Sequence, residues 1–376
     1  MGMKDAGKAI KPRILVVKHS LNRYTLPLPV EPGKAHIKYF VGYMEPLTEE
    51  ALWKNGVDFE RIGLLKMWKE IIQGKYDLVM TGIDYFPEFK GTFILCKLLG
   101  IPVAFLSDRW KWKERKRRLG LKSRLLTQCT NLFLDQADAY LVTGRKQAEY
   151  FASLGVRPEK IRVFYPRQCI QLHEAAGTRT ASDVRKQLQV EEKTMFLYTG
   201  RVLAERKNLS MVIEAFSELR KDRSETCLVL VGYGRDRKKL MAHCLKRGLT
   251  EVHFVDFIEY TDSNLKAYYE AADVFVFVGK SEPNGFSLIE ACAAGLPLIT
   301  TEDVGAAYDY AVNGVNSFVI KPDDPRELLA AMQKLAASKE LREGMGRASK
   351  EVMKSVQARL PSFEEALVEL AGGLHA

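Results

Sequence analysis

Two glutamates eight positions apart, Glu282 and Glu290, are residues whose type and spacing fit chemistry on a ligand. A continuous apolar run, residues 272–278, precedes them, and Gly285 lies in the turn between them. The run predicts a buried parallel strand, and the short apolar segment after the turn predicts a helix. Ligands gather where such strands end, and a helix start beside a glycine admits a bulky anion. An acidic pair around an anion site indicates a ligand with both phosphates and hydroxyls, as in a nucleotide-sugar.

A structural role fits the same residues. Ser287 and Glu290 match a capping box, in which Glu290 would only reach back to the Ser287 amide. However, residues 281–297 as a whole resemble the two-glutamate motif of family-four retaining glycosyltransferases, which have the GT-B fold. The strand before the motif and the strand and loop after it fit the family's order. The resemblance continues through residues 313–324.

The resemblance implies a role for each residue of the motif. Glu282 would contact the donor sugar, and Glu290 would hold the ribose hydroxyls of the nucleotide. The remaining donor-binding positions lie at the start of the helix and are Asn284, Gly285, Phe286, Ser287 and Leu288. The implied reaction is front-face transfer with retention of configuration. No Asp-x-Asp triplet occurs in the chain, which favours a reaction without a metal or other cofactor.

A second group of residues suits the same anion. Gly200 and Arg201 follow an apolar run, and Lys207 comes six residues later, before a predicted helix with Asn208 as its N-cap. The helix dipole disfavours cations at this end by about 0.3–1 kcal/mol each, a penalty that a bound diphosphate reverses. The Gly-Arg-x5-Lys spacing also resembles the family's diphosphate clamp. We therefore predict that Arg201 and Lys207 bind the diphosphate and that Arg206 faces solvent.

Two further loops of this half are weaker candidates. Gly232 lies in a glycine-containing turn after a strand, a pattern that is also typical of a plain tight turn. Phe257 and Ile258 belong to a loop that touches the nucleotide base in the resembling family. Asp256 replaces the usual glycine of that loop, which leaves recognition of the base open.

The N-terminal half departs from the family at two positions. Residues 17–23 contain no glycine, although relatives have a glycine-rich loop there. Residues 100–108 match the context of a family histidine, but Asp108 stands close to its place. Either Asp108 or His19 would then contact the donor sugar. The alternative is that His19 is an ordinary loop residue and Asp108 a helix cap.

A basic run covers residues 109–126 and carries nine cations, one glutamate and the aromatic pair Trp110 and Trp112. Aromatic anchors among cations are typical of a segment that lies on an anionic membrane surface. A solvated helix face and a nucleic-acid contact are the alternatives, and we expect no nucleic acid.

The alternation of apolar runs and amphipathic segments predicts two doubly wound parallel sheets. Runs at residues 14–17, 77–80, 103–106, 139–142 and 161–164 predict the first sheet, and runs at 195–198, 227–231, 252–255, 274–278, 298–300 and 318–320 predict the second. The fold class is therefore α/β, and the resemblance implies GT-B, with two Rossmann-like domains that face a central cleft. We expect a first, acceptor domain at residues 1–170, a linker at 171–191, a donor domain at 192–355, and a C-terminal helix at 356–376 that packs back onto the first domain.

Composition and length limit the number of domains, the partners and the location of the protein. The 376 residues suit two domains, and the net charge of +10 favours anionic partners. Six scattered cysteines, the polar residues 1–12 and the absence of a spanning segment predict a cytoplasmic protein, and the basic run predicts that it rests on the inner face of the membrane. The expected partners are a UDP- or GDP-sugar and a glycan or lipid-linked acceptor. A nucleotide-sugar epimerase and a non-catalytic binding module are the alternative functions.

Overall fold

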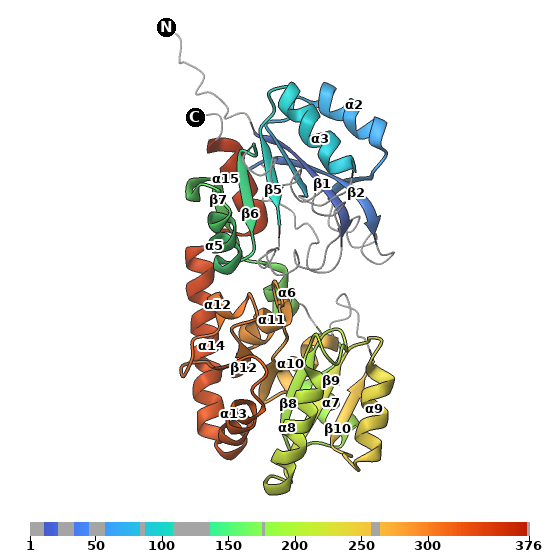
Figure 1. Cartoon of the computed structure of the whole chain (residues 1–376), viewed down its shortest axis with the longest axis vertical. Helices are drawn as coiled ribbons and strands as arrows, with labels where there is room; N and C mark the ends of the chain where they lie inside the picture. Colours follow the sequence, from blue (N-terminus) through green and yellow to red (C-terminus); the bar gives the residue numbers. More distant parts are fainter. Residues whose placement is uncertain are drawn as a thin grey trace.

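The computed structural model describes residues 11–21, 34–44, 57–82, 87–107, 136–174, 177–256 and 264–373. These residues form two sheets that follow one another along the long axis of the molecule (Figure 1). All neighbouring strands described in either sheet run parallel. Helices cover both sheets, so the predicted α/β class with two doubly wound domains is confirmed.

The first sheet has the strand order β3-β2-β1-β4-β5-β6-β7. Its strands are β1 (Arg13–Leu21), β2 (His36–Met44), β3 (Asp58–Arg61), β4 (Leu78–Gly82), β5 (Val103–Leu106), β6 (Ala139–Val142) and β7 (Ile161–Val163). One face packs against α2 (Leu64–Gly74), α3 (Pro87–Leu98) and α5 (Arg145–Ser153), and the other face packs against α15 (Phe363–Gly373). A short 3-10 helix, Pro158–Lys160, precedes β7.

The second sheet has the order β10-β9-β8-β11-β12-β13. Its strands are β8 (Thr194–Thr199), β9 (Thr226–Val231), β10 (Val252–Val255), β11 (Val274–Phe277), β12 (Leu298–Thr301) and β13 (Ser317–Ile320). The helices around it are α8 (Leu209–Asp222), α9 (Arg237–Lys246), α10 (Asn264–Ala271), α11 (Phe286–Ala294), α12 (Ala307–Tyr310), α13 (Pro325–Ala337) and α14 (Lys339–Arg359). Every residue of β8, β9, β11 and β12 is buried, which explains their continuous apolar sequences.

The described part of the segment between the sheets contains two helices. It contains α6 (Gln168–Glu174), which packs against α11, and α7 (Ala181–Leu188), which packs against α10. A capping box between Thr180 and Asp183 begins α7. The residues expected to form a linker, 171–191, thus contribute helices to the second core.

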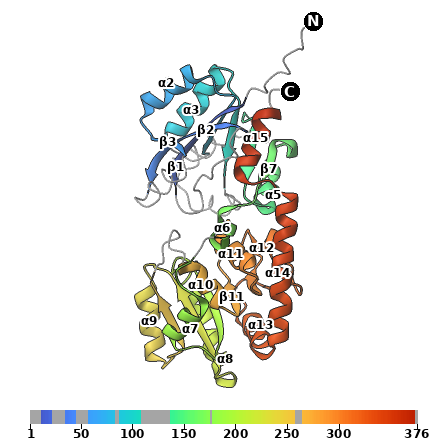
Figure 2. The same cartoon turned by 180° about the vertical axis from the view of Figure 1, so that it is seen from behind.

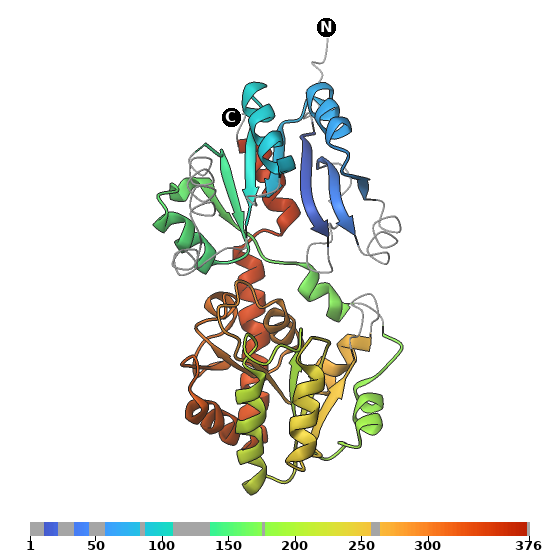
Figure 3. The same ribbon diagram turned by 45° about the vertical axis from the view of Figure 1, so that its right-hand side comes forward.

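The C-terminal helices connect the two halves. The long α14 lies along the second sheet, and α15 lies beside the first (Figures 2 and 3). Phe363 of α15 packs on Phe164, with ring centroids 5.2 Å apart, and the Lys18 ammonium lies 4.7 Å from the Phe363 ring centroid. Burial lowers the pKa of Lys18 to about 8. The last helix therefore belongs to the core of the first sheet.

Two strands of the first sheet, β2 and β3, were not among the predicted strands. Both lie on one side of β1, and β3 forms the edge of the sheet. No helix in the described part of the chain is long and apolar enough to cross a membrane.

Candidate functional site

The predicted cations and the predicted glutamate turn meet because their strands are neighbours. β8 pairs with β11 in parallel, so the loop after Thr199 and the turn after Phe277 leave the sheet side by side. The backbone amide of Lys280 donates to the carbonyl oxygen of Arg206 over 2.8 Å, which joins the two segments directly. Residues about 75 positions apart in sequence thereby form one site.

Lys207 and Glu282 form a buried ion pair in this site. Lys207 Nζ lies 2.5 Å from Glu282 Oε2, and the side chains are 8% and 13% exposed. The ammonium also lies 4.8 Å from the centroid of the Phe277 ring. Burial lowers the pKa of Lys207, the pairing with Glu282 opposes this shift, and the charges of Arg206 and Arg201 add to it. Glu282 therefore pairs with two cations, Lys207 and Arg206, and the excess of positive charge favours an anion.

The turn that carries Glu282 has an unusual backbone. Ser281 has φ 48° and Gly285 has φ 88°, both in the left-handed region. A Cβ atom on Gly285 would lie 2.7 Å from Val304 Cγ1, and one on Gly305 would lie 1.9 Å from the Pro283 carbonyl oxygen. Only glycine fits at these two positions, and the turn is consequently pressed against the loop that follows β12.

The helix start differs from the capping-box reading. α11 begins at Phe286 with Gly285 as its N-cap and has no side-chain capping bond, so Ser287 lies inside the first turn. Glu290 is completely buried, and its Oε2 accepts a hydrogen bond of 2.5 Å from the Tyr269 hydroxyl. The capping box is therefore wrong, whereas the predicted contact of Glu290 with ribose stays a prediction.

The environment of Glu290 is a buried polar chain. The Tyr269 hydroxyl lies 2.6 Å from the hydroxyl of Thr199 at the end of β8, and His173 Nε2 lies 2.8 Å from the Glu290 carbonyl oxygen. Burial lowers the pKa of His173 to about 4, so this imidazole is neutral at pH 7 and donates to the carbonyl. Sequence reasoning missed Tyr269 and His173, which lie in unremarkable helical segments.

The glycines after β8 and β9 serve close backbone packing. A Cβ atom on Gly232 would lie 2.0 Å from the Gly200 carbonyl oxygen, and Gly200 and Gly232 have φ of 141° and 144°. The fold therefore requires glycine at position 232, which agrees with the interpretation of this segment as a tight turn. Asn208 precedes α8 in a left-handed conformation without a capping bond, and its Nδ2 donates to Asp323 Oδ1 over 3.0 Å. Asn208 is therefore the N-cap residue of α8, as predicted, but its side chain bonds Asp323 instead of capping the helix.

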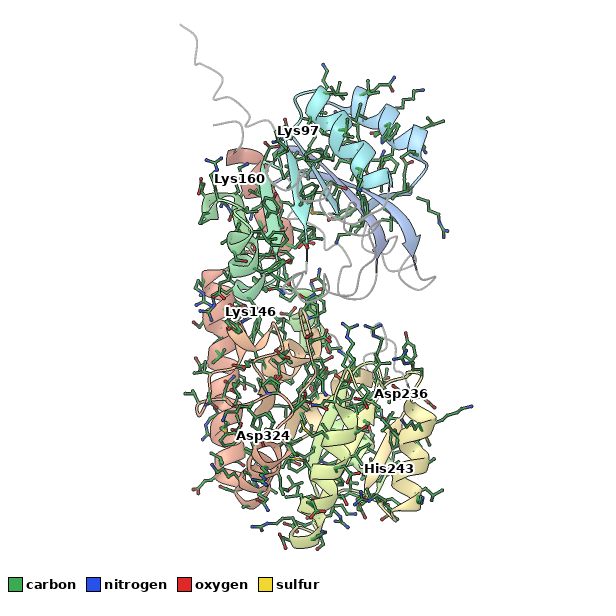
Figure 4. All side chains as sticks on the ribbon, in the orientation of Figure 1. Lys97, Lys146, Lys160, Asp236, His243 and Asp324 are labelled. Atoms are coloured by element: carbon green, nitrogen blue, oxygen red, sulfur yellow. The ribbon has the colours of Figure 1, made fainter. Side chains whose placement is uncertain are left out.

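A basic pocket of about 720 Å³ adjoins the ion pair. It is lined by Arg201, Leu203, Arg206, Tyr233, Gly234, Arg235, Arg237 and Lys238. Asp236, labelled in Figure 4 near the start of α9, accepts a hydrogen bond of 2.9 Å from the Ala204 amide and so joins two walls of the pocket. Arg206 is half-exposed, as predicted. Sequence reasoning did not identify the basic residues around the start of α9, Arg235, Arg237 and Lys238, as part of this pocket.

Several predicted residues fall outside the site as described. Asp108, Phe257, Ile258 and the basic run at 109–126 lie outside the described residues. His19 belongs to β1, whose backbone alone is described at that point. Among the described residues no group of three or more His, Cys, Asp or Glu side chains is placed to hold a metal ion.

Comparisons with known proteins agree with this geometry. Residues 180–352, which contain both glutamates and the cations, match the family model of glycosyl transferases group 1. An uncharacterized glycosyltransferase of Methanocaldococcus jannaschii is 24% identical over 302 residues, which is 77% of this chain and 74% of that protein. The glycogen synthase of Mycobacterium tuberculosis is 33% identical over 138 residues, or 36% of this chain and 32% of that enzyme.

Solved structures share the whole fold. Anabaena HepE in complex with UDP aligns with a TM-score of 0.75 and 16% identity, over 96% of this chain and 98% of that one. A glycosyltransferase of Rickettsia africae aligns with a TM-score of 0.76 and 13% identity, over 97% and 99%. The matched module, the two glutamates beside the cations and the two parallel sheets together support a family-four-like glycosyltransferase with the GT-B fold.

Proposed function

We propose that the protein moves a sugar from a nucleoside diphosphate sugar to a glycan or lipid-linked acceptor, with retention of configuration and without a metal. The observation that carries this proposal is the meeting of Arg201, Lys207 and Glu282 at the ends of two neighbouring strands. The cations in this site outnumber the carboxylates that neutralise them, so a bound diphosphate would balance the excess positive charge. HepE structures that contain UDP and UDP-glucose support a UDP-sugar as the donor.

In this proposal the cations and amides act on the leaving nucleotide, and Glu282 acts on the sugar. Arg201, Lys207 and the amides from Gly285 to Leu288 bind the diphosphate and oppose the charge that grows as the sugar C1–O bond breaks. Glu282 contacts the donor sugar. The acceptor oxygen attacks C1 from the side that the phosphate leaves, and the leaving phosphate oxygen takes the acceptor proton. His19 and Asp108 remain the two candidates for a contact from the first domain.

The product distinguishes this reaction from the alternatives. We expect UDP or GDP among the products when purified protein is incubated with an acceptor and with UDP- and GDP-sugars. In NMR spectra of the glycosylated product, the transferred sugar should have the same anomeric configuration as in the donor. An inverted product would reject the retaining mechanism. Release of an altered nucleotide-sugar in the absence of an acceptor would favour the epimerase. Because the proposed reaction needs no metal, chelation of metals by EDTA should leave turnover unchanged.

We further propose that the protein works on the inner face of a membrane, attached through residues 109–126. Each cation near an anionic surface contributes about 1 kcal/mol, so four or five of them give reversible attachment. The protein should sediment with anionic liposomes at low salt and dissociate at high salt. Failure to bind at low salt, or binding that survives neutralisation of five cations between Arg109 and Arg118, would contradict this attachment.

A further inference from the structure

The first domain contacts the turn that carries Glu282. Gln147, in the first turns of α5, donates from Nε2 to the Pro283 carbonyl oxygen over 2.6 Å and to Asn284 Oδ1 over 3.0 Å. Thr143, just after β6, donates from Oγ1 to the same Asn284 oxygen over 2.5 Å. Gln147 is 1% exposed, so these bonds are shielded from water. Two residues of one domain therefore hold the two residues that follow the glutamate in the other domain.

The opposite side of this turn is fixed within its own domain. The Gly305 amide donates to the Glu282 carbonyl oxygen over 2.8 Å, and the Ala306 amide donates to the Asn284 carbonyl oxygen over 2.6 Å. Contacts on both sides leave the turn little freedom, and its left-handed residue Ser281 shows that the conformation is imposed by its surroundings. The backbone that carries Glu282 is therefore held by contacts from both domains.

A second set of contacts joins the same two domains away from the turn. Lys146 Nζ lies 2.5 Å from the Tyr308 hydroxyl and 3.8 Å from the centroid of its ring. Lys146 neighbours Gln147 on α5, and Figure 4 labels it where the two halves of the molecule meet. Arg145 Nε also pairs with Asp309 Oδ1 over 2.7 Å. These residues bind Tyr308 and Asp309 of α12.

We propose that Gln147 and Thr143 are positioning residues that couple the first domain to the donor-sugar end of the site. When the domains lie together as in this structure, these side chains fix Pro283 and Asn284 and thereby set Glu282 against the sugar. The nucleotide is held by Arg201, Lys207 and the amides from Gly285 to Leu288, all in the second domain. The bond from the Ala306 amide to the Asn284 carbonyl oxygen keeps that helix start in place, so binding of the nucleotide would not depend on Gln147 and Thr143. This inference rests on the proposed function.

The test compares Gln147→Met with Lys146→Met. Gln147→Met keeps the length of the side chain and removes both hydrogen bonds to the turn, whereas Lys146→Met removes an interdomain contact that does not touch it. We expect Gln147→Met to weaken binding of UDP-glucose about tenfold in calorimetry, the effect of one or two lost hydrogen bonds, and to leave binding of UDP unchanged. Lys146→Met should change neither affinity. Thr143→Val provides the same test if Gln147→Met does not fold.

Each outcome has a separate meaning. Equal affinities for UDP-glucose in the two Met variants, or a loss of UDP binding that matches the loss of UDP-glucose binding, would overturn the positioning role. A wild-type protein that binds neither UDP nor UDP-glucose would instead contradict the proposed UDP-sugar donor, on which the inference depends. A lower melting temperature in both variants with normal affinities would assign the contacts to stability alone.

Discussion

Arg201→Ala is expected to lower turnover by about 10²- to 10³-fold, the loss seen when one group that stabilises the developing charge is removed. Arg201 is exposed and lines the basic pocket, so its removal leaves no cavity and no unpaired buried group. The folded state should therefore keep its stability within about 0.5 kcal/mol, as for most surface substitutions. Steady-state kinetics with the donor found by product analysis measure the effect.

Arg235→Ala is the matched control for this experiment. Arg235 lines the same pocket and carries the same charge, but its side chain is 83% exposed and it lies on the loop before α9. We expect near wild-type turnover for this variant. Wild-type turnover in Arg201→Ala would contradict the assignment of Arg201 to the diphosphate. An equal loss of turnover in both variants would instead indicate a general effect of positive charge.

The sequence predicted the second sheet more completely than the first, and burial explains the difference. β8, β9, β11 and β12 are covered on both faces, so apart from threonines at their ends their positions select apolar residues and give recognisable runs. β3, at the edge of the first sheet, reads Asp-Phe-Glu-Arg and has no buried residue. β2 begins with exposed and half-buried residues at its N-terminal end. Strands of such mixed polarity have no continuous apolar run, so this pattern does not distinguish them from loops.

Part of the donor site was likewise predictable from the sequence, and part of it was not. Arg201, Lys207 and Glu282 each follow a predicted strand, and parallel pairing alone brings strand ends together, so their meeting was predictable. The contact of Gln147 with Asn284 links residues 137 positions apart in different domains, and no local pattern encodes it. The capping box failed for the opposite reason. Its local pattern at Ser287 is sound, but the helix begins at Phe286 and tertiary burial directs Glu290 toward Tyr269.

The Lys207–Glu282 pair gives the largest expected effect on stability. Lys207→Met should lower the free energy of unfolding by about 3 kcal/mol, because breaking a buried pair leaves the remaining charge uncompensated. Glu282 would then be a nearly buried carboxylate, paired only weakly with Arg206, whose Nη2 lies 3.9 Å away. Turnover should also fall by about 10²-fold or more, since a cation that opposes the developing charge is lost. Urea unfolding and steady-state kinetics measure the two effects.

The double variant Lys207→Met/Glu282→Gln separates structure from function. It removes both charges, so the uncompensated carboxylate disappears and most of the lost unfolding free energy should return. Turnover should stay low, because a neutral pair neither binds the diphosphate nor contacts the donor sugar as the proposed mechanism requires. Recovery of turnover along with stability would show that the pair acts only in folding. A stable single variant without activity would instead show that the two charges are not coupled in the free protein, although the cation is still needed by the donor.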